Sequence, residues 1–127
     1  MRDISFYDLV VVGHFAIDII VKNGEAMGGA LGGPPTYASL AASKMGAKVS
    51  IISKVGDDFP EEHIKFLSEN GIDLTGLKVV KDARTTNYVL AYEDGERKLV
   101  LKARAPDIAL EDIPPDLVAR SVLLAPI

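Results

Sequence analysis

Apolar residues are spaced along the chain in patterns that predict strands and helices in alternation. Residues 6–12 form an apolar, β-branched run that ends at Gly13, which predicts a strand buried on both faces, as in a parallel sheet. A second short strand is expected at 18–21. Residues 24–33 hold five glycines, which predicts a flexible connection in place of a helix or a regular strand.

Two helical patterns follow, each between strand patterns. Pro35 suits the first turn of a helix, where its missing N–H costs no hydrogen bond, and apolar residues then recur at helical spacing up to Gly46. A strand is expected at 49–52, and a second helix then begins near Asp58, which we interpret as its N-cap, and closes at Gly71. Strand, helix, strand, helix, strand predicts right-handed crossovers around a parallel sheet.

The pattern changes in the second half of the chain. Residues 86–92 alternate, which places Tyr88 and every second residue after it on one face of a strand. Asp94 and Gly95 predict a turn into a strand at 97–101, and therefore an antiparallel hairpin. Joined by the strand that starts at Asp18, this hairpin would form a small sheet that projects from the main one.

The last residues carry another buried-strand pattern, at 121–125. A parallel strand normally feeds a further helix, so we predict an α/β fold with a doubly wound, mostly parallel sheet that is truncated at its C-terminal side. An unpaired apolar strand edge invites association. We therefore expect the chain to form a homodimer or to aggregate.

Composition narrows the possible functions. The chain has 127 residues, 48% of them hydrophobic, and a net charge of −4, which fits one compact domain and offers no basic surface for nucleic acid. There is no cysteine, and His14 and His63 lack the spacing of metal ligands, so we predict no protein-held metal. No apolar run is long enough for a membrane span, and the cytoplasm is the expected location.

The turn containing Gly32 and Gly33 has three possible uses. A Walker A loop needs Gly-Lys-Ser/Thr before its helix, whereas Pro34 follows here, and a dinucleotide fold needs its glycines directly after the first strand. Both interpretations fail. The glycines could instead let the backbone approach a small ligand above the helix N-terminus, whose free N–H groups can bind hydroxyls. The alternative is a loop that needs positive φ only for its bend.

Three motifs together resemble a known family. They are the run 32–39 followed by Gly46, the segment 56–58, and the opening Val11-Val12-Gly13 with Asp18 five residues later. In type and spacing they are similar to the N-terminal signature of the ribokinase, or PfkB, family, and the likeness covers essentially the whole chain. The clear departure is Tyr37, where most members have asparagine.

The resemblance implies a set of substrate-binding residues. They are Asp18, Gly32, Gly33, Tyr37 and Tyr88. An ionised carboxylate only accepts hydrogen bonds, so the family's aspartate would hold two adjacent substrate hydroxyls. The glycines would line the sugar pocket with their backbone. A turn or cap aspartate and a core tyrosine at position 37 are the alternative interpretations.

The projecting sheet, approximately 17–24 and 85–104, corresponds to the lid that closes over substrate in this family. Lys102 or Arg104 could neutralise an acidic substrate group, but solvated charges at a strand end are the favoured interpretation. His14 is favoured as a structural histidine. Residues 56–58 are interpreted as helix capping.

The resemblance also implies a function. The intact protein would phosphorylate a hydroxyl of a sugar, polyol or nucleoside with ATP and Mg²⁺. Family members carry the catalytic base, the anion hole and the nucleotide site in their C-terminal half, and residues 1–127 hold no counterpart. We therefore assign no catalytic residue and no bound cofactor to this chain and expect it to be inactive alone. The alternatives are a non-catalytic module for polyol binding or dimerisation and, more remotely, a dinucleotide-dependent oxidoreductase.

Overall fold

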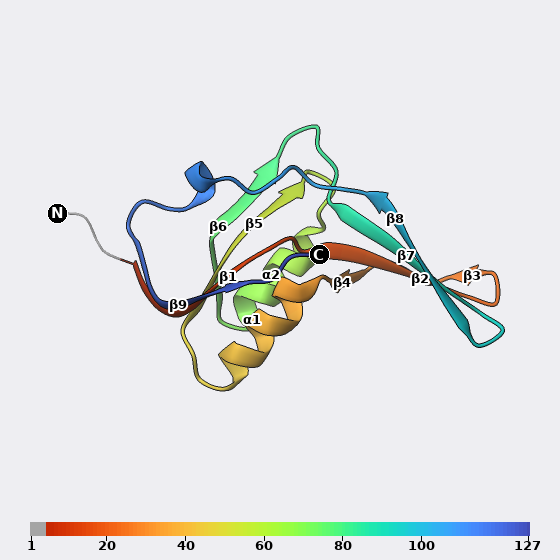
Figure 1. Cartoon of the computed structure of the whole chain (residues 1–127), viewed down its shortest axis with the longest axis horizontal. Helices are drawn as coiled ribbons and strands as arrows, with labels where there is room; N and C mark the ends of the chain where they lie inside the picture. Colours follow the sequence, from red (N-terminus) through yellow and green to blue (C-terminus); the bar gives the residue numbers. More distant parts are fainter. Residues whose placement is uncertain (1–4) are drawn as a thin grey trace.

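Two β-sheets of different character make up the molecule (Figure 1). A computed structural model describes residues 5–127. The body sheet is parallel throughout and has the strand order β6-β5-β1-β9. Its strands are β1 (Ser5–Val12), β5 (Val49–Gly56), β6 (Ile72–Val80) and β9 (Leu117–Leu124). The predicted mostly parallel α/β fold is confirmed.

Helices α1 (Pro34–Lys44) and α2 (Glu61–Glu69) pack on one face of the body sheet. The main core lies between these helices and the sheet. It includes Ile51, Phe15 and Leu67, none of which is exposed. Burying apolar surface of this kind supplies most of the stability of a small domain. Both helices end as predicted, because Gly46 and Gly71 adopt the positive φ angles, 92° and 81°, that suit glycine after a helix.

The opposite face of the body sheet is covered by the segment that leads to β9. Tyr7, Val10 and Ile52 form a second buried cluster there, and Ile108 packs against it. A short 3₁₀ turn, η1 (Leu110–Asp112), lies on this segment. Irregular chain therefore covers the face that helices leave free.

Asp112 fastens that covering segment to the sheet. Its carboxylate is buried and lies 2.8 Å from the Lys54 ammonium and 2.6 Å from the Lys78 ammonium. The backbone N–H of Ala109 donates a third hydrogen bond to it, at 2.7 Å. The hydrogen bond from Lys54, then those from Lys78 and Ala109, hold the pKa of Asp112 well below its usual range.

The second sheet, which we call the projecting sheet, extends away from the body (Figure 1). Its strands are β2 (Ala16–Lys22), β3 (Glu25–Ala26), β4 (Ala30–Gly32), β7 (Thr86–Glu93) and β8 (Glu96–Ala103). The predicted hairpin of β7 and β8 is antiparallel, and β2 joins β7 in parallel because both strands leave the body at the same edge. The sequence pattern specified the hairpin but not this parallel pair.

The glycine-rich segment 24–33 is more regular than we predicted. It is not a flexible connection throughout, since β3 and β4 both pair with β2 in antiparallel register. Tertiary pairing here outweighs the low strand preference of glycine. At Gly29 the backbone lies close to the side chain of Ile17. A Cβ atom at this position would lie only 2.6 Å from Cγ2 of Ile17, so glycine suits the position.

Residues 56–58 do not cap α2, so that interpretation was wrong. The N-cap of this helix is Pro60, with no side-chain capping bond. Oδ1 of Asp58 instead accepts hydrogen bonds from the N–H and the hydroxyl of Thr85, at 2.8 and 2.7 Å. Oδ2 of Asp57 accepts one from the N–H of Asp82, at 2.9 Å. The two aspartates therefore hold the connection between β6 and β7.

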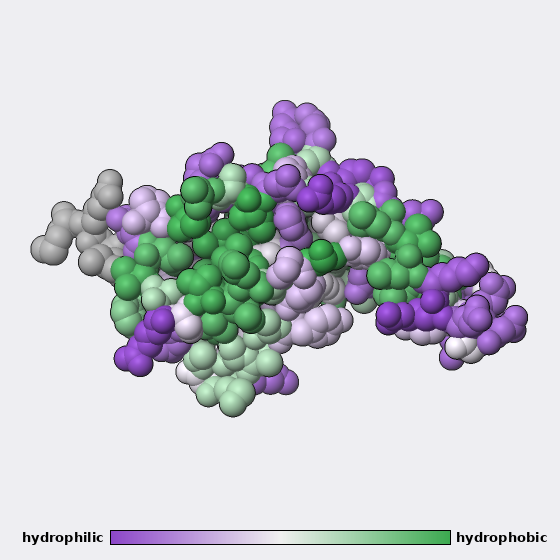
Figure 2. Space-filling model, in the orientation of Figure 1, coloured by the Kyte–Doolittle hydropathy of each residue, from purple (hydrophilic) through white to green (hydrophobic). Residues whose placement is uncertain are grey.

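The strand predicted near the end of the chain exists as β9 and lies at one edge of the body sheet. It is not buried as its pattern suggested, because Val122 and Leu124 are 58% and 71% exposed. Hydrophobic residues gather over this part of the body in Figure 2. Association through this edge stays a prediction. Within residues 5–127, no helix is long and apolar enough to cross a membrane.

Candidate functional site

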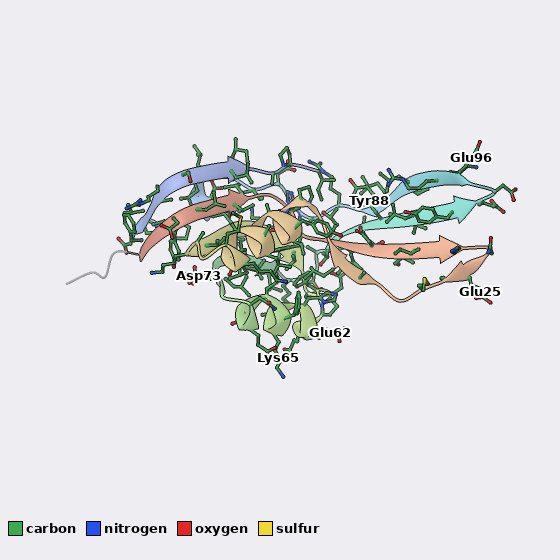
Figure 3. All side chains as sticks on the ribbon, turned by 90° about the horizontal axis from the view of Figure 1, so that it is seen from below. Glu25, Glu62, Lys65, Asp73, Tyr88 and Glu96 are labelled. Atoms are coloured by element: carbon green, nitrogen blue, oxygen red, sulfur yellow. The ribbon has the colours of Figure 1, made fainter. Side chains whose placement is uncertain are left out.

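A cavity of about 400 Å³ lies where the two sheets meet. It sits beyond the carboxyl ends of β1 and β9 and at the start of α1, the position where open α/β sheets commonly bind ligands. Figure 3 shows Tyr88 at the base of the projecting sheet, beside the body, whereas Glu25 and Glu96 lie at its far tip. The residues that line the cavity are Ala16, Asp18, Gly33, Pro34, Tyr37, Tyr88, Leu90, Leu99 and Ile127.

Asp18 is the one carboxylate in this lining. It lies on β2 in register with Tyr88 of β7, so the two side chains are neighbours on one face of the projecting sheet. Among the residues that the structure describes, none gives the Asp18 side chain a hydrogen bond or an ion pair. Partial burial raises the pKa of Asp18 above its ordinary value. Its oxygens are therefore free to accept hydrogen bonds from a ligand.

Gly32 lies against the Asp18 carboxylate so closely that a Cβ atom would overlap Oδ2 of Asp18. At Gly33, φ is 88°, and a Cβ atom there would lie 2.6 Å from the carbonyl oxygen of His14. Any larger residue would push the start of α1 away from β2. The paired glycines therefore set the distance between the helix and the carboxylate.

The start of α1 offers fewer free N–H groups than we expected. Pro34 and Pro35 have none, and the N–H of Thr36 bonds to the carbonyl oxygen of Gly33 at 3.1 Å. The Thr36 hydroxyl in turn donates to the carbonyl oxygen of Gly32 at 2.7 Å. Hydrogen bonds within the turn thus engage the N–H and the hydroxyl of Thr36, and Asp18 is the charged side chain in the cavity lining.

Two tyrosines border the cavity from different elements. Tyr37 stands on the first turn of α1 and is 64% exposed, so it is not the core aromatic that we had considered as an alternative. Tyr88 is half-buried on β7. All five residues that the sequence singled out therefore lie together: four line the cavity, and Gly32 packs behind Asp18.

Sequence reasoning missed the apolar part of the lining. Leu90 is two residues after Tyr88 on β7, and its partner in register on β8 is Leu99. The alternation of β7 placed Leu90 on the same face as Tyr88, so that signal was present in the sequence. Ala16 and Pro34 carried no such signal, because only the close approach of β2 and α1 brings them into the lining.

A smaller cavity of about 270 Å³ adjoins the first and shares Tyr88 and Ile127 with it. His14 and Arg104 line it. A ring nitrogen of His14, Nε2, lies 2.8 Å from the carbonyl oxygen of Pro106, which fits the structural role that we favoured. Arg104 pairs with the exposed Asp107 at 2.7 Å, and Lys102 is exposed and lines neither cavity.

The described residues do not fit a metal-nucleotide site. Within residues 5–127, no group of three or more histidine, aspartate or glutamate side chains could hold a metal ion. The glycine turn lacks the Lys-Ser/Thr that cradles phosphates.

Comparison with protein families gives one match. Residues 7–109 match the model of the pfkB family carbohydrate kinases. The chain is 38% identical over 92 residues to a cytidine kinase of Thermococcus kodakarensis, which covers 69% of this chain and 31% of that protein. It is 32% identical to a nucleoside kinase of Methanothermobacter thermautotrophicus, covering 68% and 32%, and 33% identical to a fructokinase of Solanum tuberosum, covering 72% and 32%.

Solved structures show the same fold. An uncharacterized sugar kinase from Pyrococcus horikoshii, in complex with ATP, superposes with a TM-score of 0.71 at 26% identity over 85% of this chain and 39% of that one. A pyrophosphate-dependent kinase of the ribokinase family, complexed with a pyrophosphate analogue and myo-inositol, gives 0.69 at 24% identity over 93% and 39%. The chain thus spans about a third of the length of the relatives that it matches.

Proposed function

This chain belongs to the pfkB family of carbohydrate kinases, and on that premise we propose that the intact protein phosphorylates a hydroxyl of a sugar, polyol or nucleoside. In that step the acceptor oxygen bonds to the terminal phosphorus of ATP, the bond from that phosphorus to its bridging oxygen breaks, and the hydroxyl proton leaves. The products are the phosphorylated acceptor and ADP. This chain supplies acceptor binding.

The unpaired carboxylate of Asp18 is the observation that carries this proposal. A partly buried carboxylate without a partner is unfavourable in the free protein, which its raised pKa reflects. Hydrogen bonds from two acceptor hydroxyls would satisfy it. Such charge-assisted bonds are among the stronger ones in proteins, at about 1.5–3 kcal/mol each. Asp18 would therefore fix the acceptor, while Gly32 and Gly33 keep the backbone close.

The projecting sheet, approximately 17–24 and 85–104, acts in this proposal as a lid over the acceptor. Support comes from the cavity lining, since Asp18, Tyr88, Leu90 and Leu99 all belong to this sheet. A lid that closes excludes water from the transferred phosphoryl group. The pairing of β2 with β7 would make both strands move together.

ATP with Mg²⁺ is the proposed donor, and residues outside this chain would bind it. Similarity to a sugar kinase that is complexed with ATP supports the nucleotide. The likeness to a pyrophosphate-dependent kinase makes pyrophosphate the donor to test against it. The names of the relatives leave the acceptor among sugars, inositols and nucleosides.

The test is a phosphoryl-transfer assay on the full-length protein that carries this chain. Each acceptor class would be offered with ATP and Mg²⁺ and, separately, with pyrophosphate. We expect transfer from ATP to at least one acceptor. The variant Asp18→Asn keeps the shape of the side chain but loses its charge, and we expect kcat/KM to fall about 100-fold or more.

Other outcomes would decide between the alternatives. If no acceptor is phosphorylated and the protein still binds a polyol, the non-catalytic module would be favoured. Full activity in Asp18→Asn would contradict the assignment of the site. A matched control is Asp82→Asn, because Asp82 is exposed at positive φ in the connection before β7 and outside the cavity.

A further inference from the structure

The acceptor cavity is polar at one point and apolar almost everywhere else. Asp18 is its one charged side chain, and the hydroxyls of Tyr37 and Tyr88 are the only other polar side-chain groups in its lining within residues 5–127. The rest of the lining is aliphatic side chains, proline and glycine. A ligand that fits it should therefore carry its hydroxyls on one side and an apolar or flat surface on the other.

Free sugars and inositols do not have that shape. A hexose or an inositol carries hydroxyls around the whole ring, whereas the side chains of Leu90, Leu99 and Pro34 in the lining offer no hydrogen-bond partner. Burying a hydroxyl without a hydrogen bond is unfavourable. A nucleoside divides its polarity differently, because the ribose holds adjacent hydroxyls and the base presents two flat faces.

We infer that the acceptor is a nucleoside, with its ribose hydroxyls at Asp18 and its base against the rings of Tyr37 and Tyr88. This inference rests on the proposed function and names its substrate class. Asp18 and Tyr88 are register neighbours on β2 and β7, so ribose and base can contact adjacent positions of one sheet face. The group transfer is the one written above, with a ribose hydroxyl as acceptor.

The two tyrosines have the exposure that a stacking surface needs. Tyr37 lines the cavity and is 64% exposed, so its ring is accessible to a ligand. Bases stack readily on such rings, since every base has a flat π face. Leu90 and Leu99 extend the apolar surface next to Tyr88. The cavity, at about 400 Å³, lies within the range of small-ligand sites.

The experiment compares acceptors and variants in the full-length protein with ATP and Mg²⁺. The acceptors are cytidine, uridine, adenosine, free ribose, fructose and myo-inositol. We expect kcat/KM for at least one nucleoside to exceed that for ribose, fructose and myo-inositol at least tenfold. In Tyr37→Ala and Tyr88→Ala, KM for that nucleoside should rise about tenfold. Tyr37→Phe and Tyr88→Phe should stay within about threefold of the wild type, because the ring remains.

The matched control is Tyr92→Ala. Tyr92 lies further along β7, is 41% exposed and does not line the cavity, so KM should not change. Free ribose offers a second control: its kcat/KM should change less than threefold in the alanine variants, since it lacks the base. Should Tyr88→Ala unfold, Tyr88→Leu keeps an apolar side chain without an aromatic ring.

Failure of this inference and failure of the proposed function give different results. Preference for fructose or myo-inositol over every nucleoside would overturn the inference and leave the kinase assignment standing. An equal fall of kcat/KM for ribose and for the nucleoside in Tyr37→Ala would also overturn it, because the effect of the ring would then not depend on a base. Transfer to no acceptor at all would overturn the proposed function itself.

Discussion

The body sheet and the projecting sheet both contain apolar strands, but β5 of the body sheet is buried whereas β8 of the projecting sheet is exposed. In β5, seven of the eight residues are buried, and the strand lies in the middle of the core. In β8, every residue but the last is exposed, although Leu99, Val100 and Leu101 are as apolar as any core strand. Helices cover one sheet, and nothing in residues 5–127 covers the outer part of the other. A sheet that leaves its apolar surface open can offer it to a ligand.

The largest contrast should appear in stability. Ile51→Ala removes a fully buried side chain from the core, and we expect the free energy of unfolding to fall by about 2–5 kcal/mol. Val100→Ala on β8 removes a side chain that is 43% exposed and should change it by no more than about 0.5 kcal/mol. Chemical denaturation of both variants measures the difference. Equal losses would show that the projecting sheet belongs to the same core.

A smaller effect is expected where irregular chain covers the body sheet. Asp112→Asn leaves the nearly buried ammonium of Lys54 without its carboxylate, and we expect a loss of about 1–3 kcal/mol at neutral pH. The pKa of Asp112 is lowered in the folded protein, so its contribution is complete above the unfolded value of about 4 and is lost as pH falls further. The gap between wild type and variant should therefore shrink below about pH 4. A gap that stays constant with pH would contradict the ion-pair account.

Local sequence signals predicted much of the body because its turns are chemically marked. Pro34 and Pro35 fix the start of α1, and Gly46 and Gly71 end the two helices with positive φ. The apolar, β-branched runs of β1 and β5 could be assigned directly as buried strands. Each of these features depends on residues that are close together in the sequence.

Features that depend on distant partners were not predictable in the same way. The sequence position of Asp58 is typical of a helix cap, but in the folded chain its carboxylate accepts hydrogen bonds from Thr85. The binding of Asp112 to Lys54 and Lys78 joins three separate segments and leaves no local pattern. The candidate site combines both cases: the motif predicted Asp18 and the glycines, whereas pairing across β7 and β8 was needed to find Leu99.

The central claim is that Asp18 holds the acceptor, and acceptor binding as a function of pH tests it most directly. Calorimetric titration of the full-length protein with a nucleoside, without donor, would be compared with Asp18→Asn. The raised pKa of Asp18 means that its charge is lost as pH falls through that value, so wild-type affinity should weaken there. Asp18→Asn should bind at least tenfold more weakly at neutral pH and show no such dependence. Equal affinity of the two proteins at neutral pH would contradict the account.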